Sequence, residues 1–355
     1  MKKLRYAIVG FGGIAVNRIA KEGFAADRDR FEPLALAELA GATDISPARK
    51  TAAEALGLKW YDSPEAVFAD AAIDAVFIAS NNLSHFPLAK QAMGAGKHVI
   101  IEKPMATRLD HAAELTTLAA ERNLSLSVDH MMIHNSYNRK AREVIAQGLL
   151  GELNDITLHM EFCYGSTPEE AATWRCARPE ELGGPIGDVA SHCFYMGEFL
   201  TDSKIVEVSA VYTPKILDIR AENGAFIKFR TASGLRGTVR VSFNDARGNL
   251  ESTLLNLGYE VYGSKKVLRA HGTLFQLSGH AGEPIRLRIG TDKGDGCEAI
   301  QVGEVENIYQ RVILEHAESI RTGQRLTGGE GLHNLRLVLA SHESAGSGGK
   351  AVVIQ

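Results

Sequence analysis

The chain has 355 residues, of which 45% are hydrophobic, with a formal net charge of −4 and a pI near 6.3. This length favours two domains over one. The charge balance excludes the basic stripe that nucleic acid binding needs and the polybasic arm that anionic lipid needs. Because no run of about 20 apolar residues occurs, we expect no membrane span.

Cysteines are scattered through the chain without a C-x-x-C spacing: Cys163, Cys176, Cys193 and Cys297. This pattern indicates neither a disulfide framework nor a closed zinc site, so we expect reduced thiols and a cytoplasmic protein. The charged and apolar start of the chain resembles a signal peptide in outline. Its glycines would make a poor signal helix, and a glycine turn is the better interpretation.

Short apolar runs alternate with helical segments over residues 1–129. The expected strands are LRYAIVGFGG, PLALAELAGATD, IDAVFIAS, KHVIIE and LSLSVDH. The second run would also suit a helix, because it is rich in Ala and Leu. The helix SHFPLAKQAMGAG has Ser84 as its expected N-cap. This rhythm predicts an α/β domain with a doubly wound parallel sheet.

Residues 130–355 follow a different pattern and predict a second domain of α+β type. After one helix, NRKAREVIAQGLLG, come seven expected strands: NDITLHMEFCYG, IVEVSAVYTP, GAFIKFRTASG, LRGTVRVSF, TLLNLGYEVYG, KKVLRAHGTLFQLSG and IRLRIG. Turns rich in glycine and serine separate them, as hairpins of a large, mainly antiparallel sheet require. Two helices, ENIYQRVILEHAESIRTG and EGLHNLRLVLASHESAG, close the chain.

The first strand is followed directly by a glycine turn, VGFGGIA. Its residues are Gly10, Phe11, Gly12, Gly13 and Ile14. Between a strand and a helix, such glycines permit a tight turn and let the backbone approach a pyrophosphate at the positive end of the helix. The spacing alone would also suit a purely structural turn.

An acidic residue at the end of the second strand would bind the adenosine ribose and select NAD over NADP. Glu38 has nearly the expected spacing, but Asp44 precedes the turn ISPAR that starts the next helix. We therefore favour Asp44. Arg49 lies close enough in sequence to leave NADP open, although a solvent-exposed helix position would also explain it.

The stretch VFIASNNLSHFPLAKQAMGAGKHVIIEKPMA resembles the second half of the nucleotide domain of the Gfo/Idh/MocA oxidoreductases. The similarity covers essentially the whole chain and implies a Rossmann domain followed by an α+β domain. It implies that Glu102 and Lys103 lie beside the nicotinamide and bind the cofactor, and that Lys103 also serves substrate binding and catalysis. The peptide before Pro104 is commonly cis in this family.

The same resemblance implies further cofactor contacts from Ser80, Asn82 and His85 after the fourth strand. For His85, a structural histidine in the first turn of a helix is an equally good interpretation. Trp174 and Arg175 match a Trp-Arg pair of the family. They would either close over a sugar, by stacking and hydrogen bonding, or simply anchor their loop.

A D-x-x-x-H pair, Asp188 and His192, follows a glycine-rich turn as it does in this family. Residues i and i+4 share one face of a helix, and histidine exchanges protons near neutral pH. An ordinary surface pair would show the same spacing. Combined with Lys103 and the glycine loop, the pattern predicts catalytic roles for both residues.

Departures from the family pattern leave the substrate open. Tyr195 stands where many relatives have Asp, and Met131 and Met132 stand where many have a basic pair. Methionines there are typical of core or adaptable lining. His130 and His134 would contact substrate or serve the fold. With Asp129 they form no clean metal site, and we expect no metal.

These patterns predict an NAD(P)-dependent dehydrogenase that acts on a secondary alcohol of a sugar, cyclitol or related polyol. His192 would accept the hydroxyl proton, Lys103 would stabilise the developing charge, and Asp188 would orient the site. An NAD-dependent glycoside hydrolase acting by transient oxidation uses the same residues. A non-catalytic nucleotide sensor would not need them. We also expect a homodimer or homotetramer that covers an apolar face of the second sheet.

Overall fold

The structure is a computed structural model that describes residues 2–245, 257–272, 287–294 and 296–355. The chain divides into two compact units. Unit 1 comprises Met1–Met131 and Glu306–Leu335, and unit 2 comprises Met132–Val305 and Arg336–Gln355.

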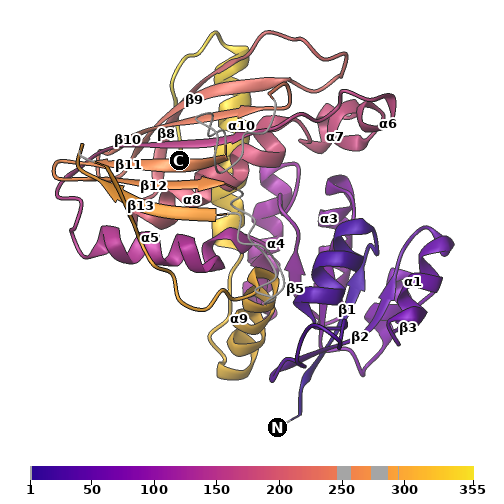
Figure 1. The fold of residues 1–355 in the computed structure, drawn as a ribbon. Helices are drawn as coiled ribbons and strands as arrows, with labels where there is room; N and C mark the ends of the chain where they lie inside the picture. Colours follow the sequence, from indigo (N-terminus) through magenta and orange to yellow (C-terminus); the bar gives the residue numbers. More distant parts are fainter. Residues whose placement is uncertain (1, 246–256, 273–286, 295) are drawn as a thin grey trace. The chain divides into compact units, whose positions relative to one another are not determined.

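Unit 1 contains a six-stranded parallel sheet with the strand order β3-β2-β1-β4-β5-β6 (Figure 1). Its strands are β1 (Leu4–Val9), β2 (Ala37–Thr43), β3 (Lys59–Trp60), β4 (Ala75–Ile78), β5 (His98–Ile101) and β6 (Leu126–Val128). The direction of winding reverses between β1 and β4, where a doubly wound sheet binds ligands outside its carboxyl ends. The predicted doubly wound sheet is confirmed, and the ambiguous second run forms β2.

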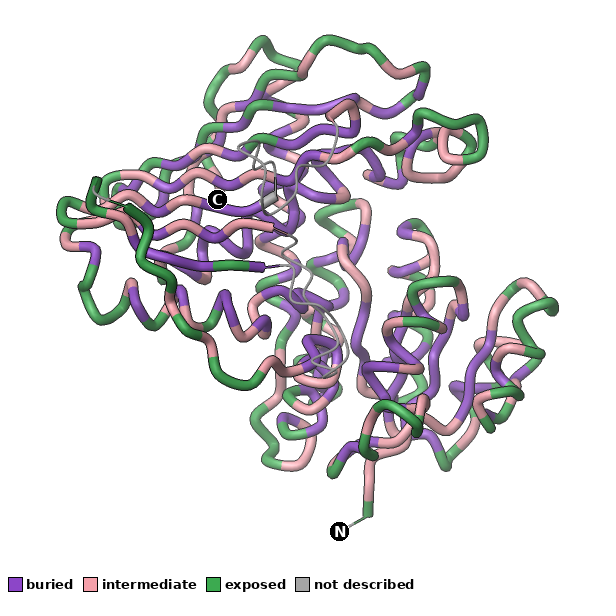
Figure 2. Tube along the Cα trace, in the orientation of Figure 1, coloured by how far each residue is buried: buried purple, intermediate pink, exposed green. Residues whose placement is uncertain are grey.

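The central strands of this sheet are buried on both faces. Every residue of β4 is inaccessible to solvent, and β1 and β5 are also largely buried (Figure 2). A parallel sheet covered by helices on both sides needs such continuous apolar strands, because no position faces water. The run IDAVFIAS is therefore uninterrupted by polar residues at its centre.

The helices and helical turns of unit 1 are η1 (Ala15–Gly23), η2 (Pro47–Arg49), α1 (Lys50–Ala55), α2 (Pro64–Ala69), α3 (Asn82–Gly94), α4 (Leu109–Glu121) and α9 (Ile308–Thr322). The prediction of Ser84 as the N-cap of α3 is wrong, since Asn81 holds that position. Ser84 lies in the first turn, where its hydroxyl donates to Asn81 Oδ1 (2.6 Å). Strand β3 and helix α2 were not predicted.

Helix α9 comes late in the chain but packs on η1, β2 and β5. The Tyr6 hydroxyl donates to His316 Nδ1 (2.9 Å), and the hydroxyl oxygens of Ser125 and Ser319 lie 2.5 Å apart. These buried contacts join α9 to β1 and β6. They explain why residues 306–335 group with unit 1, whereas the sequence-based division kept 130–355 together.

Unit 2 contains a nine-stranded sheet with the order β14-β13-β12-β11-β7-β10-β9-β8-β15. Its strands are β7 (Leu153–Glu161), β8 (Ile205–Tyr212), β9 (Gly224–Thr231), β10 (Arg236–Ser242), β11 (Leu257–Gly263), β12 (Val267–Gly272), β13 (Leu287–Asp292), β14 (Cys297–Ala299) and β15 (Val352–Val353). Among the described residues of this sheet, only β7 and β10 pair in parallel, so the mainly antiparallel sheet is confirmed. Parts of three predicted strands, at 253–256, 273–279 and 285–286, lie outside the described residues.

The remaining helices and helical turns are η3 (Met131–His134), α5 (Ser136–Ala146), α6 (Pro168–Ala171), α7 (Trp174–Ala177), η4 (Pro179–Glu181), η5 (Ile186–Ala190), α8 (Ser191–Thr201) and α10 (Gly329–Gly346). Helix α8 packs on β7, and α5 packs on α8. Along β9 the inward residues are buried and the outward residues are exposed, as alternation in a half-covered sheet requires.

The outward face of this sheet is more polar than the sequence predicted. Phe226 is 47% exposed, and its direct neighbours across the sheet are Val211, which is 46% exposed, and Arg240. The titratable side chains of His159, Glu161 and Glu260 lie on the strands beyond, β7 and β11. Burial lowers the pKa of His159, yet its hydrogen bonds to Glu161 and Glu260 outweigh burial and raise the pKa to about 9. The outward face is therefore mixed in character, and its burial by another subunit stays a prediction.

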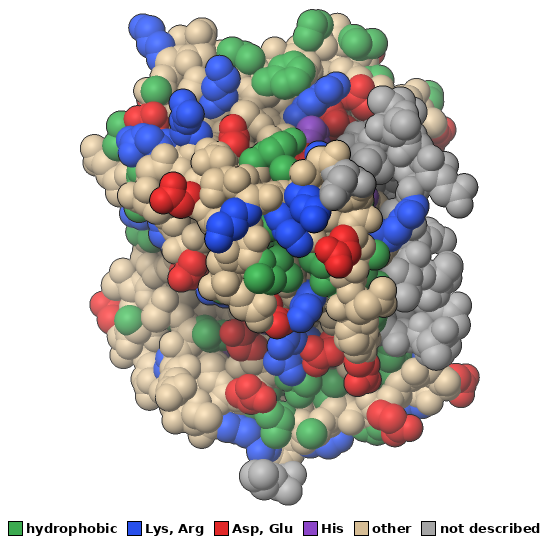
Figure 3. Space-filling model, turned by 60° about the vertical axis from the view of Figure 1, so that its left-hand side comes forward, with side chains coloured by type: hydrophobic (Ala, Val, Ile, Leu, Met, Phe, Trp, Pro, Cys, Tyr) green, Lys and Arg blue, Asp and Glu red, His purple; other side chains and the backbone are tan. Residues whose placement is uncertain are grey.

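The described surface carries both signs of charge. On the face drawn in Figure 3, acidic and basic side chains are interspersed, without a continuous basic stripe among the residues shown. None of the helices in the described ranges has the length and apolar composition to cross a membrane. All four cysteines are free thiols, as predicted.

Candidate active site

The glycine loop lies between β1 and η1, at the point where the sheet reverses. Gly10 has a φ of +92°, and a Cβ atom there would lie 2.7 Å from the backbone nitrogen of Ser80. Only glycine fits this position. A Cβ at Gly12 or Gly13 would meet nothing within 4 Å. The backbone therefore has open space above a helix start, which fits a diphosphate group.

Asp44 lies beside this loop. Its carboxylate oxygens accept the backbone N–H of Phe11 (2.6 Å) and of Ser46 (2.8 Å). Glu38 lies near the other end of β2, where it forms an ion pair with Arg5 (3.5 Å). Of the two predicted acids, the structure brings Asp44 to the carboxyl edge of the sheet and leaves Glu38 away from it.

Large apolar side chains are exposed near the same edge. Ile14 in the loop is 47% exposed, Leu83 in α3 is 44% exposed, and Ile45 after Asp44 is fully exposed. A flat aromatic ligand such as adenine would remove this surface from water. The sequence analysis named only Ile14, because a single apolar residue in a loop carries no recognisable pattern.

Ser80, Asn82 and His85 follow β4. The ring nitrogens of His85 lie 2.7 Å from the Pro104 carbonyl oxygen and 3.2 Å from that of Ser80, and the side chain is fully buried. His85 thus connects the segments that follow β4 and β5. Asn82 is also buried, at the start of α3. These contacts show a structural role for His85, and a cofactor contact stays a prediction.

The segment Glu102-Lys103-Pro104 follows β5 at the carboxyl edge of the sheet. The Lys103–Pro104 peptide bond is cis, as the resemblance implies. Lys103 is half-buried, and its backbone N–H donates to Glu102 Oε2 (3.2 Å). The backbone of Lys103 therefore lies at the same edge of the sheet as the glycine loop.

Asp129, which the sequence analysis considered only as a metal ligand, follows the neighbouring strand β6 and is fully buried. Burial raises the pKa of its carboxyl well above the usual value, and the nearby Glu102 adds to this. The available signal was an Asp directly after a buried strand. Among the described residues, no group of three or more His, Cys, Asp or Glu could hold a metal ion.

Asp188 and His192 lie one turn apart on the continuous helical stretch of η5 and α8 in unit 2. His192 is 2% exposed, and its Nδ1 lies 2.6 Å from the hydroxyl oxygen of Tyr195. Tyr195, noted only as a departure from the family, thus orients the predicted base. The sequence could have shown this from the i,i+3 spacing of the two residues.

Asp188 is paired with a cation. Its Oδ2 lies 3.5 Å from Arg175 Nε, and the Arg175 guanidinium carbon lies 4.4 Å from the centre of the Trp174 ring. Trp174 and Arg175 therefore contact each other, and Arg175 pairs with the Asp188 carboxylate. This arrangement supports the interpretation of Trp174 and Arg175 as loop anchors, while a substrate contact stays a prediction.

The remaining predicted residues lie in η3 or directly before it. Met131 and Met132 are buried in the core, as expected for a methionine pair. His130 is 8% exposed, and His134 is half-buried. Their contacts with substrate stay predictions.

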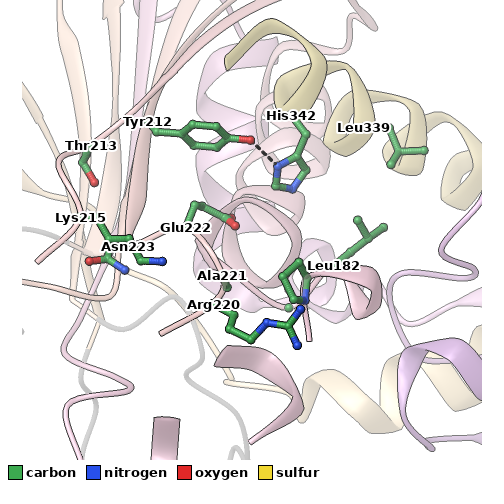
Figure 4. Close-up of a pocket in the computed structure, with 12 residues that line it drawn as sticks. Leu182, Tyr212, Thr213, Lys215, Arg220, Ala221, Glu222, Asn223, Leu339 and His342 are labelled. Carbon is green, nitrogen blue, oxygen red and sulfur yellow. Dashed lines mark hydrogen bonds between the residues drawn. The ribbon is translucent and has the colours of Figure 1, made fainter. Parts of the chain in front are cut away.

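A cavity of about 450 Å³ lies in unit 2 between the β8–β9 connection and α10 (Figure 4). The Tyr212 hydroxyl and His342 Nδ1 form a hydrogen bond (3.0 Å) at one side of it. Glu222 also lines the cavity and accepts the N–H of Ile186 (2.8 Å) through Oε1. None of the predicted site residues lines it. Glu222 matters to the site because it fixes the start of the helical stretch that carries Asp188.

Two sequence models of one family match the chain. Residues 4–130 match the model described as "Oxidoreductase family, NAD-binding Rossmann fold", and residues 138–269 match the GFO/IDH/MocA C-terminal domain. The protein is a Gfo/Idh/MocA oxidoreductase. The predicted family, the fold class and the NAD(P) cofactor are thereby confirmed.

Individual relatives of this Gfo/Idh/MocA oxidoreductase differ in how much they share with it. An uncharacterised oxidoreductase, sll0816 of Synechocystis sp., is 36% identical over 38% of this chain and only 36% of its own length. The 1,5-anhydro-D-fructose reductase of Ensifer adhaerens is 26% identical over 82% of this chain and 83% of its own. The solved structure of an inositol dehydrogenase homologue from Azotobacter vinelandii, complexed with NADH and myo-inositol, has a TM-score of 0.78 at 21% identity and covers 99% of this chain and 98% of that one.

Proposed function

We propose that this oxidoreductase transfers hydride between a nicotinamide cofactor and a secondary alcohol of a sugar, cyclitol or related polyol. The observation that carries the proposal is that Lys103 directly follows β5, at the carboxyl edge of the parallel sheet and in the same unit as the glycine loop. A reductase of an anhydro sugar and a homologue complexed with myo-inositol are similar to this chain, which supports this substrate class.

In the proposed reaction, the nicotinamide, when bound, would accept the hydride. His192 accepts the proton of the substrate hydroxyl, as general base. If Nδ1 donates its proton to Tyr195, the imidazole is neutral and its lone pair is on Nε2. Lys103 stabilises the negative charge that develops on the substrate oxygen, and Asp188 orients the site while Arg175 holds it.

The residues around the glycine loop would hold the cofactor. The backbone of Gly12 and Gly13 would contact the diphosphate, and Asp44 would accept hydrogen bonds from the ribose. A carboxylate there repels a 2′-phosphate, so we propose NAD as the preferred cofactor, with Arg49 leaving NADP possible. The family match supports this oxidoreductase over the redox-neutral hydrolase and over the sensor.

The decisive experiment compares Lys103→Ala with the wild type. We expect kcat/KM to fall roughly 10²–10³-fold, because an oxyanion-stabilising group is lost, while NAD affinity changes little. The substrate is first identified with a panel of sugars, sugar acids, cyclitols and glycosides, in which turnover is measured by the absorbance of reduced nicotinamide. Lys50→Ala, which removes an exposed lysine of α1, is the matched control. Normal turnover by Lys103→Ala would refute the assignment.

We also propose that the protein is cytoplasmic and forms a homodimer or homotetramer through the outward face of the unit 2 sheet. The half-exposed Phe226 among charged side chains supports this surface. Light scattering of Phe226→Asp, compared with the wild type, tests it. A wild type that is monomeric at micromolar concentration would contradict the proposal.

A further inference from the structure

Two carboxyl groups follow neighbouring strands at the carboxyl edge of the parallel sheet. In the register of β5 and β6, Ile101 pairs with Val128, so Glu102 and Asp129 are the next residues on the two strands. The Asp129 backbone N–H donates to the Ile101 carbonyl oxygen (2.8 Å), which continues the ladder to this point. The backbone therefore brings the two acids together, beside Lys103.

The Asp129 carboxyl group is fully buried and lacks a hydrogen-bond donor. Neither of its oxygens accepts a hydrogen bond from any residue of the described ranges. A buried carboxylate without a donor or a paired cation is very costly, and such a group takes up a proton instead. Glu102 differs, because it is only half-buried and its Oε2 accepts the Lys103 N–H.

The charged and titratable groups around Asp129 come from several elements. Burial is the main cause that raises its pKa, the Glu102 charge is the next, and Lys103 acts in the opposite direction. On α9, burial raises the pKa of Tyr309, and the charges of Asp129 and Glu102 add to this. The phenol therefore stays neutral. Arg18 and Glu22 of η1 act on Tyr309 with opposite signs.

We propose that Asp129 holds a proton at neutral pH and donates it in a hydrogen bond to the Glu102 carboxylate. The two acids then carry one negative charge next to the one positive charge of Lys103. Asp129 is thus a positioning residue, which keeps Glu102 and the segment that carries Lys103 in place. The catalytic consequence rests on the proposed function, but the proton on Asp129 does not.

The proton is tested by unfolding, without any activity. Because its folded pKa is raised, Asp129 keeps a proton that the unfolded chain loses above its ordinary pKa of about 3.9, so its stabilising contribution is lost as pH rises. Asp129→Asn has no such proton. Over roughly pH 5 to 8, we compare the unfolding equilibrium constant of the wild type with that of Asp129→Asn. The ratio of the two constants should rise about tenfold per pH unit, until the folded pKa of Asp129 is reached.

A pH-independent ratio would overturn the proposal. If Asp129→Asn does not fold, Glu102→Gln replaces it as the test. Without the Glu102 charge, the Asp129 pKa falls, and the pH dependence of unfolding should be smaller than in the wild type. An unchanged dependence in Glu102→Gln would show that Glu102 is not the partner.

The positioning role is tested by activity across pH. Asp129→Ala removes the donor, and we expect kcat/KM to fall roughly tenfold, as for a misplaced catalytic segment. Asp129→Asn supplies an N–H donor that does not titrate, so it should recover part of that loss and keep its activity to higher pH than the wild type. Identical pH profiles for Asp129→Asn and the wild type would refute the positioning role.

The two experiments distinguish this inference from the proposed function. If no alcohol substrate is found, the proposed function fails, and the unfolding ratio still decides whether Asp129 holds the proton. If activity is found and the unfolding ratio is flat, the proposed function stands and the inference falls.

Discussion

Each unit has an acid near a predicted catalytic group, but the two acids differ in burial and in their partners. In unit 1, Asp129 is fully buried and has another carboxyl group, Glu102, as its neighbour. In unit 2, the Asp188 side chain is 14% exposed and lies 3.5 Å from the Arg175 guanidinium. A carboxyl group beside an acid keeps a proton, whereas one beside a cation loses it.

This difference separates the roles of the two regions. In unit 2, Asp188 is paired with Arg175, and His192 is the residue that our proposal makes the proton acceptor. Unit 1 instead contains Lys103 next to two acids, Glu102 and Asp129, which by our proposal share one proton. The pH dependence of catalysis should therefore arise from His192 on the acidic side and from Asp129 on the alkaline side.

The largest expected effect follows from replacing His192. His192→Gln removes the proposed general base, and we expect kcat to fall roughly 10²–10⁴-fold. The pH profile should also lose its acidic limb, because the variant has no group to protonate. Steady-state rates from pH 5 to 9, chosen to span roughly the titration of histidine, measure both effects.

Tyr195→Phe sharpens this result. It removes the hydroxyl beside His192 Nδ1 but leaves the ring, so kcat should fall much less than in His192→Gln while the apparent pKa of the acidic limb shifts. Tyr164→Phe removes a hydroxyl elsewhere in unit 2, near Thr173, and serves as control. If His192→Gln kept the wild-type acidic limb, the proton would be exchanged elsewhere and the division of roles would be wrong.

A smaller effect is expected at Asp44, an acid of unit 1 that lies beside the glycine loop. Its carboxylate accepts two backbone N–H groups, and it would repel a 2′-phosphate. Asp44→Asn keeps most of these contacts but removes the charge. We expect kcat/KM for NAD divided by kcat/KM for NADP to fall roughly tenfold, because the variant no longer repels the 2′-phosphate of NADP. A like-charge contact can cost several kcal/mol, and solvent weakens it here.

Glu38→Asn is the matched control for this change, because Glu38 lies on the same strand but away from its carboxyl end. It should leave the cofactor ratio unchanged. A shift in Glu38→Asn instead of Asp44→Asn would reverse the assignment of the ribose-binding acid.

Much of the fold could be predicted because its signals are local. Continuous apolar runs such as IDAVFIAS, together with glycines after strands, predict buried parallel strands and their turns. The short edge strands β3 and β14 lack such runs. The pairing of β7 with β10 and the packing of α9 on unit 1 depend on contacts between residues far apart in the chain, which no local pattern encodes.

The candidate site shows the same limit. Motifs located Lys103, Asp188 and His192, since each occurs within a short recognisable stretch. The partners that determine their charge were missed or misread, because Asp129 meets Glu102 across two strands and Arg175 meets Asp188 through a turn. Only Tyr195, three residues from His192, could have been inferred from spacing alone.

The smallest expected effect concerns a buried base, His316. It tests whether burial keeps this base uncharged, as we propose that it keeps the acid Asp129 uncharged. His316 in α9 is fully buried, and burial lowers its pKa to about 3. The Tyr6 hydroxyl donates to Nδ1, and Nε2 lies 3.2 Å from the Ser125 carbonyl oxygen, which suits a neutral ring with its proton on Nε2.

Because the folded pKa of His316 is lowered, its stabilising contribution is present above its unfolded pKa of about 6.5 and is lost as pH falls toward the folded value. Between pH 6 and 5, the wild type should lose roughly 1 kcal/mol of unfolding free energy relative to His316→Gln. This slope is opposite in sign to that expected for Asp129, because burial disfavours the charged form of an acid and of a base alike. Denaturant unfolding of the wild type and of both variants over roughly pH 5 to 8 measures the two slopes. Slopes of equal sign would contradict the burial argument for both residues.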